Sequence, residues 1–130
     1  MEPLIIPGTE ICPDVRLDVL NNIFEIKGKS IPPDGKTFYE PILDWLKIYS
    51  YNPNQTTNFR FNLEFFNITS SKMLLFILYK LSDIHASGFN VNITWCYGDD
   101  DMFEVGEDYA YMINIPFDFI ANPEKTDSAA

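Results

Sequence analysis

The stretch NITSSK, residues 67–72, places three consecutive hydroxyl side chains, Thr69, Ser70 and Ser71, directly before Lys72. It lies where a predicted strand gives way to a predicted helix. One hydroxyl is expected there as an N-cap, because it accepts a hydrogen bond from a free N–H group of the first turn. One cap needs one hydroxyl, however, and a lysine in the first turn opposes the helix dipole by roughly 0.3 to 1 kcal/mol.

Both unusual features of this motif are explained if an anion is attached to it. A phosphoryl group at a helix N-terminus meets unpaired N–H donors and the positive end of the dipole, and Lys72 adds a charge-assisted contact. It also adds roughly −1.5 to −2 units of charge to the surface. The motif therefore predicts a phosphorylation site, and capping without regulation is the alternative for all three hydroxyls.

Little else in the sequence favours catalysis. His85 is the only histidine and has no nucleophile nearby, so an exposed or capping role near a helix C-terminus is expected. The sequence contains no GxGxxG, Walker or HExxH motif. Cys12 and Cys96 form no CxxC pair and are expected to be buried, reduced thiols. We expect a non-catalytic protein without a cofactor.

A run of acidic residues is the one candidate for a metal site. Hard cations such as Ca²⁺ and Mg²⁺ bind several oxygen ligands, but this run lacks the spacing and the glycine of an EF-hand. Acids before a helix are more simply explained as an N-cap and first-turn residues that complement the dipole. The run comprises Asp99, Asp100, Asp101, Glu104, Glu107 and Asp108.

Composition and charge restrict the class of protein. The 130 residues are 46% hydrophobic and carry a net charge of −10. Such a charge repels nucleic acid and anionic membranes, so protein partners are expected. The N-terminus lacks the basic and apolar regions of a signal peptide, and no segment is long enough to span a membrane. We predict a cytoplasmic protein with one domain, residues 1–121, and a disordered polar tail, residues 122–130.

The first half of the chain predicts a hairpin and a helix. Residues 15–20 and 23–28 alternate apolar and polar side chains around Asn21-Asn22, which is typical of an antiparallel hairpin. Residues 38–49 place apolar side chains at helical spacing, with Pro41 in about the first turn, where its missing N–H costs little.

The second half predicts a strand, a buried helix and a second strand. Residues 59–65 and 91–97 alternate, and the apolar segment 72–81 lies between them, which implies a right-handed crossover and a parallel pair. Residues 102–109 predict a short helix, weakened by about 1 kcal/mol at Gly106. Residues 113–119 contain Pro116 and predict an edge strand. The fold class is therefore α/β, with a mixed sheet and helices mainly on one face.

Three motifs occur in order along the chain. The first is a Gly-x-Ser-x-Pro loop leading to Phe-Tyr-x-Pro and a tryptophan, the second is a turn of Asn, Ile, Thr and Ser followed by a lysine, and the third is a late Trp-x-Tyr with an acidic run and Gly-Glu-Asp. Their residues are Gly28, Ser30, Pro32, Phe38, Tyr39, Pro41, Trp45, Asn67, Ile68, Thr69, Ser70, Lys72, Trp95, Tyr97, Asp99 to Asp101, and Gly106 to Asp108. In their order and spacing these motifs resemble the SiaC family of bacterial regulatory phosphoproteins, in which the second motif is an Asn-Thr-Ser-Ser turn followed by a basic residue.

The resemblance implies a STAS-like fold and a role in partner switching. A cognate Ser/Thr kinase would phosphorylate the turn, a metal-dependent Ser/Thr phosphatase would reverse this, and the unphosphorylated form would bind and activate a diguanylate cyclase in c-di-GMP signalling. Three alternatives remain open: an anti-sigma-factor antagonist of the STAS class, a small acidic metal-dependent enzyme, and a constitutive scaffold that is never phosphorylated.

The sequence departs from the family at the phosphorylation site. The acceptor threonine of the family directly follows the asparagine, and Ile68 occupies that position here. Either Thr69 has taken over, at or before the N-cap and with Ser70 next in line, or this turn is no longer switched. In the first case, Asn67 ends the strand and shapes the turn, Ser71 neighbours the site, and Lys72 compensates the phosphate charge.

Overall fold

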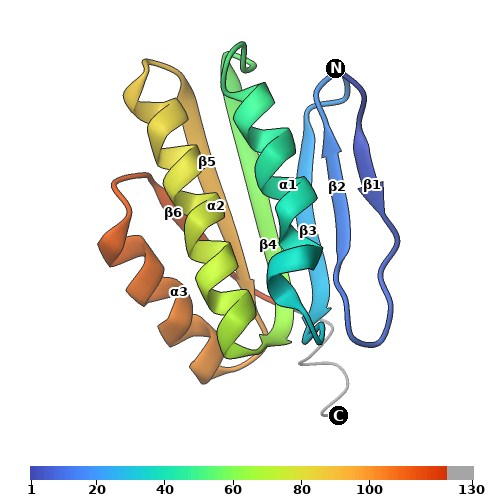
Figure 1. Ribbon diagram of the computed structural model, residues 1–130. Coiled ribbons are helices and arrows are strands. Elements are labelled where there is room, and N and C mark those ends of the chain that lie inside the picture. The colour runs from blue at the N-terminus through green and yellow to red at the C-terminus, as the bar shows by residue number, and fades with distance from the viewer. Residues whose placement is uncertain (123–130) are drawn as a thin grey trace.

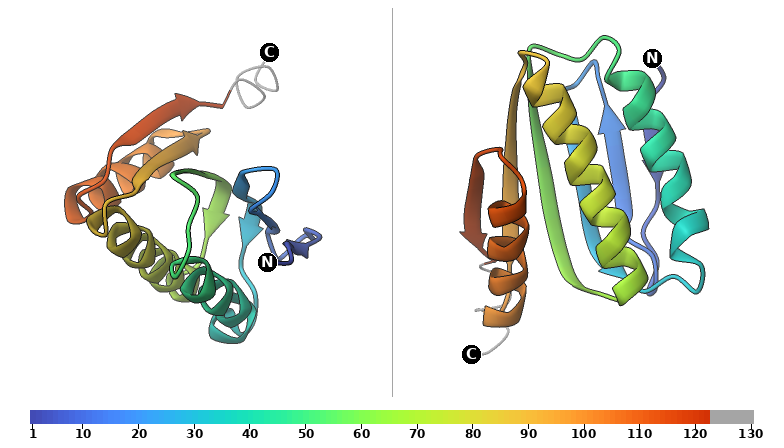
Figure 2. Two further views of the ribbon diagram at one scale, coloured as in Figure 1. Left: turned by 90° about the horizontal axis from the view of Figure 1, so that it is seen from above. Right: turned by 60° about the vertical axis from the view of Figure 1, so that its left-hand side comes forward.

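A computed structural model describes residues 1–122. Within these residues, six strands form one sheet in the order β1-β2-β3-β4-β5-β6, and three helices lie over one of its faces (Figures 1 and 2). The elements in chain order are β1 (Leu4–Ile6), β2 (Asp14–Asp18), β3 (Ile23–Ser30), α1 (Gly35–Tyr49), β4 (Thr56–Phe66), α2 (Ile68–Ala86), β5 (Asn90–Tyr97), α3 (Asp100–Met112) and β6 (Phe117–Ala121). The predicted α/β class with a mixed sheet is confirmed.

The sheet is antiparallel on one side and parallel on the other. β1, β2 and β3 pair antiparallel, and β3 to β6 pair parallel. The crossovers through α1 and α2 therefore bring both helices onto the same face, where they lie side by side (Figure 1). The carboxyl ends of β3 and β4, and so the amino ends of α1 and α2, meet at one edge of this layer.

Apolar and polar side chains alternate along the strands, which explains why one face of the sheet is packed against the helices and the other is not. In β4, Phe59, Phe61 and Leu63 are buried under the helices. Arg60 lies on the opposite face, where its Nε is 3.2 Å from Oε2 of Glu25 on β3. The polar alternate positions thus remain on the uncovered face, as the sequence predicted.

Several details differ from the sequence predictions. Pro41 lies in the second turn of α1, because the helix already begins at Gly35. The short edge strand β1 was not predicted. The last strand begins only after Pro116, so Ile113 and Ile115 are buried in the connection that precedes it.

Two further details concern the end of α2 and the end of the described residues. α2 ends at Ala86, and Gly88 follows its C-cap with φ +104°, a conformation that glycine adopts readily. Of the predicted tail, residues 123–130 lie outside the described residues. Asn122 is described, and its backbone N–H donates to the carbonyl of Tyr97 at 2.7 Å.

Candidate functional site

The predicted phosphorylation motif lies at the start of α2. Asn67 is the N-cap, and its Oδ1 accepts a hydrogen bond from the backbone N–H of Ser70 at 2.9 Å. Its own N–H donates to the carbonyl of Ser30 at 3.0 Å, which ties the end of β4 to β3. The expectation that a hydroxyl caps the helix, with Thr69 at or before the N-cap, was wrong, because asparagine caps as well as serine and comes first in the chain. Thr69 is instead the second residue of α2.

The three hydroxyls of the motif have different surroundings. Thr69 is exposed. Ser70 is fully buried, and its Oγ accepts a hydrogen bond from Oγ of Ser30 at 2.8 Å. Ser71 is half-buried, and its Oγ donates to the carbonyl of Ile68 at 2.6 Å. Thr69 is therefore the most exposed of the three hydroxyl-bearing residues.

A buried polar network holds the first turn of α2 in place. The hydroxyl oxygens of Tyr39, on α1, and Ser30 are 2.6 Å apart. Since Ser30 has one hydroxyl proton and donates it to Ser70, Tyr39 is the donor in this pair. Burial raises the pKa of Tyr39 to about 12, so its proton stays in place at physiological pH.

A second tyrosine reaches the same turn from α3. The hydroxyl of Tyr109 donates to the carbonyl of Ser71 at 2.8 Å, and burial raises the pKa of this tyrosine above its ordinary value. Hydrogen bonds from β3 and α3 thus reach residues 70 and 71, and α1 is linked to Ser70 through Ser30. These hydrogen bonds hold residues 70 and 71 in place, while the side chain of Thr69 remains exposed to solvent.

Thr69 also contacts the start of α1. A Cβ placed on Gly35, the first residue of α1, would lie 2.8 Å from Cγ2 of Thr69. This is closer than van der Waals contact, so the two helix N-termini approach each other as closely as a glycine permits. Asp34, the N-cap of α1, directs its carboxylate to the backbone N–H and the hydroxyl of Thr37. Those hydrogen bonds lower the pKa of Asp34.

This contact predicts coupling between Gly35 and Thr69. Gly35→Ala is expected to lower the free energy of unfolding by about 0.5 to 2 kcal/mol, because the new methyl group overlaps the threonine methyl. Thr69→Ser removes that methyl and keeps the hydroxyl, so the same alanine should cost close to nothing in the serine background. Urea unfolding of the four proteins measures the coupling. Equal costs of Gly35→Ala in both backgrounds would show that the two methyl groups do not meet.

Lys72 lies one turn beyond the exposed threonine. Its Nζ is 5.8 Å from the centroid of the Phe76 ring, a cation–π arrangement on the outer surface of α2. Ile68, at the family's acceptor position, is 88% exposed and has no hydroxyl. Thr69 and Lys72 are thus both exposed, three residues apart on α2, whereas Ser70 is buried.

The other candidate residues have structural roles. Asp99 is the N-cap of α3, and its Oδ1 accepts from the backbone N–H of Met102 at 2.8 Å, which confirms the capping interpretation. His85 lies in the last turn of α2, where its Nδ1 is 3.1 Å from the carbonyl oxygen of Phe89. Within residues 1–122, no three His, Cys, Asp or Glu side chains come close enough to hold a metal ion.

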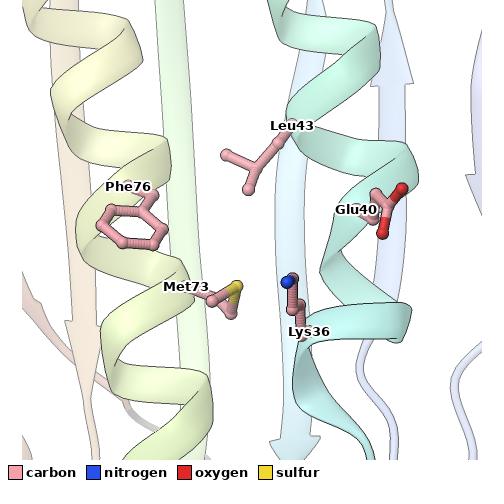
Figure 3. Close-up of a pocket in the computed structure, with 5 residues that line it drawn as sticks. All are labelled: Lys36, Glu40, Leu43, Met73 and Phe76. Carbon is pink, nitrogen blue, oxygen red and sulfur yellow. The ribbon is translucent and has the colours of Figure 1, made fainter.

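The sequence did not predict a hollow between α1 and α2, whose lining residue Met73 lies one helical turn beyond Thr69. It has a volume of about 300 Å³ (Figure 3). The residues around it are Lys36, Glu40, Leu43, Met73 and Phe76. A signal for it was present, because residues 36, 40 and 43 and residues 69, 73 and 76 share the i, i+4, i+7 spacing that places side chains on one face of a helix.

The sequence profile of the SiaC family regulatory phosphoproteins matches residues 6–122 of this chain. The chain belongs to the SiaC family. An uncharacterized protein of Pseudomonas aeruginosa strain UCBPP-PA14 is 25% identical over 126 residues, which cover 95% of this chain and 100% of that protein. The resemblance inferred from the sequence motifs is thereby confirmed.

Solved structures of SiaC share the fold of this SiaC-family chain. The crystal structure of apo-SiaC from P. aeruginosa matches with a TM-score of 0.86 and 25% identity, over 93% of this chain and 100% of that one. SiaC in the crystal structure of the diguanylate cyclase SiaD in complex with its activator SiaC, also from P. aeruginosa, matches with a TM-score of 0.85 and 24% identity, over 92% and 99% of the two chains. Within residues 1–122, no helix has the length and apolar character needed to cross a membrane.

Proposed function

We propose that this SiaC-family protein is a cytoplasmic, non-catalytic switch whose unphosphorylated form binds and activates a diguanylate cyclase. The observation that carries the proposal is the family match over residues 6–122, together with a relative of the same fold that activates the cyclase SiaD. A cognate Ser/Thr kinase adds the phosphate, and a metal-dependent Ser/Thr phosphatase removes it.

Thr69 is the proposed phosphate acceptor. Its side chain is exposed, and Ile68 before it has no hydroxyl. A phosphate there lies in the first turn of α2, where backbone N–H groups point toward the N-terminal end of the helix and the helix dipole favours an anion. Lys72, three residues further along the helix, supplies a positive charge on the neighbouring turn.

Ser70 and Ser71 are less suitable acceptors. A phosphate on Ser70 would replace a hydroxyl that is fully buried and bonded to Ser30, so the turn would have to open first. Ser71 is half-buried and donates its proton to the helix backbone. Access by a kinase therefore favours Thr69.

Phosphorylation by the cognate kinase tests this assignment. We expect the unaltered protein to gain one phosphoryl group on incubation with kinase and ATP, and Thr69→Ala to gain none, as measured by intact-protein mass spectrometry. Thr69→Ser is the matched control and should be phosphorylated, since it keeps the hydroxyl in place. Full modification of a Thr69→Ala, Ser70→Ala double variant would rule out both residues.

The regulatory step is tested by cyclase activity. The unphosphorylated protein should stimulate c-di-GMP synthesis by the cognate cyclase, and the stoichiometrically phosphorylated protein should not. Equal stimulation by both forms would contradict the switch. Absence of stimulation by either form would contradict the choice of partner and favour the anti-sigma-factor antagonist of the STAS class.

A further inference from the structure

The hollow between α1 and α2 lies within a longer stripe of residues at helical spacing along both helices, and we call this stripe the α1–α2 groove. On α1, Lys36, Glu40 and Leu43 line it, and Lys47 is the next residue at the same spacing. On α2, Met73 and Phe76 line it, with Thr69 at one end of the stripe and Lys80 at the other. Figure 3 shows the Leu43 and Met73 side chains extending into the space between the two helices. The proposed phosphate acceptor is therefore an end residue of this groove.

The floor of the groove is apolar and partly open. Met73 is buried, Leu43 is half-buried, and Phe76 is 38% exposed. Within the described residues, every buried side-chain nitrogen and oxygen atom has a hydrogen-bond partner, so no buried polar group is left unpaired beneath the groove to orient a small polar ligand. An apolar strip between two parallel helices instead fits side chains that project at i, i+3, i+4 and i+7 from a third helix.

The charge around the groove differs from that of the rest of the chain. α1 and α2 together carry four lysines, Lys36, Lys47, Lys72 and Lys80, and three carboxylates, whereas the whole chain has a net charge of −10. α3, on the other side of α2, carries five carboxylates and no lysine or arginine. A partner helix with carboxylates beside its apolar residues would be attracted to the groove and repelled by α3.

We propose that the α1–α2 groove receives an acidic amphipathic helix of the cyclase, and that phosphate on Thr69 excludes this helix. The proposal rests on the function proposed above and adds where the partner binds. The apolar side of the partner helix covers Leu43, Met73 and Phe76, and its carboxylates face the surrounding lysines.

Phosphorylation acts at the end of the same surface. The phosphate adds roughly −1.5 to −2 units of charge beside the groove. It repels the carboxylates of the partner helix and engages Lys72, which lies on the neighbouring turn of α2, so this lysine is no longer free to pair with the partner. In this proposal the added charge alone excludes the partner helix, and the fold does not rearrange.

Affinity for the full-length cognate cyclase tests the groove. We expect Phe76→Ala to weaken binding about 10- to 30-fold, because an aromatic side chain at the centre of an interface contributes strongly. Lys36→Glu and Lys80→Glu should slow association and reduce its dependence on salt. The matched controls are Ile48→Ala on α1 and Tyr111→Ala on α3; both side chains are exposed and lie outside the groove. Titration calorimetry and surface plasmon resonance measure these effects on the unphosphorylated chain.

The outcomes separate this proposal from the one on which it rests. If the unaltered chain neither binds nor activates the cyclase, the proposed function fails, and the groove proposal fails with it. If the unaltered chain binds and activates, but the groove variants bind as tightly as the two controls, only the groove proposal is overturned. Hydrogen exchange of the unaltered complex gives a second test that needs no variant. Protection of residues 36–47 and 69–80 supports the groove, and protection confined to α3 or the uncovered sheet face overturns it.

Discussion

Replacing Ser70 with aspartate is expected to lower the free energy of unfolding by about 3 to 5 kcal/mol at pH 7, because the substitution buries a charge without a counter-charge. The hydroxyl of Ser70 is fully buried beside Ser30 and Tyr39. Both of these neighbours are neutral hydroxyls. Urea unfolding, monitored by circular dichroism, measures the loss. Ser70→Asn is the matched control, because asparagine has nearly the size of aspartate but carries no charge.

The pH dependence of this loss follows from the burial of the introduced carboxyl. Burial raises its pKa above the value of about 3.9 that it has in the unfolded chain, so the folded form binds the proton more tightly. Stability therefore falls as the pH rises from about 4 toward the folded-state pKa. The difference between Ser70→Asp and Ser70→Asn should shrink at acid pH, and a difference independent of pH would mean that the carboxyl reaches solvent.

Thr69→Asp is the informative comparison. The side chain at residue 69 is exposed and lies in the first turn of α2. A carboxylate there is expected to stabilise the protein by about 0.3 to 1 kcal/mol through the helix dipole. Opposite effects at adjacent residues would support Thr69 as the site that accepts a negative charge. A similar loss at both positions would mean that neither accepts one in the folded state.

The sequence predicted the existence of the main elements more accurately than their ends. The strands of the hairpin and of the strand-helix-strand unit were recognisable because their side chains alternate, and alternation reports which face is packed. The capping residue was not recognisable, since Asn67, Thr69 and Ser70 have similar intrinsic preferences for that position. The backbone bond between Asn67 and Ser30 favours the asparagine, and this contact joins residues far apart in the sequence.

The proposed phosphorylation motif was singled out in the sequence for reasons that are only partly correct. Three hydroxyls were unnecessary for one cap, and the structure assigns a separate hydrogen bond to Ser70 and to Ser71. Thr69 is the one of the three that is exposed. The groove escaped prediction because it depends on how α1 and α2 lie against each other, and their shared spacing has meaning only once the parallel crossovers place them side by side.

Gly106 is a further residue whose role the sequence could not define. Its cost to α3, about 1 kcal/mol relative to alanine, predicted a weak helix. In the structure, a Cβ at Gly106 would overlap the indole ring of Trp95 and come within 2.9 Å of Cε1 of Phe119. The ring of Trp95 is held in place, since its Nε1 donates to the carbonyl of Met102 at 2.9 Å. The missing side chain therefore allows α3 to pack on β5.

This arrangement predicts a change of sign in a double-mutant cycle. Trp95→Ala is expected to lower the free energy of unfolding by about 3 to 5 kcal/mol, because it removes a buried aromatic ring. Gly106→Ala in the unaltered protein should cost about 1 to 3 kcal/mol through overlap with that ring. In the Trp95→Ala background the overlap with the indole is gone, and the same alanine should stabilise the protein by up to about 1 kcal/mol through helix propensity.

Urea unfolding of the four proteins measures the cycle. Glu107→Ala, at an exposed position of α3, is the control for helix propensity and should have the same small effect in both backgrounds. If Gly106→Ala costs as much without the indole as with it, the ring of Phe119 or the helix backbone sets the requirement for glycine. If the sign reverses, Trp95 sets it. The start of α2 would then depend indirectly on this glycine, because the close packing of α3 positions Tyr109, whose hydroxyl reaches the carbonyl of Ser71.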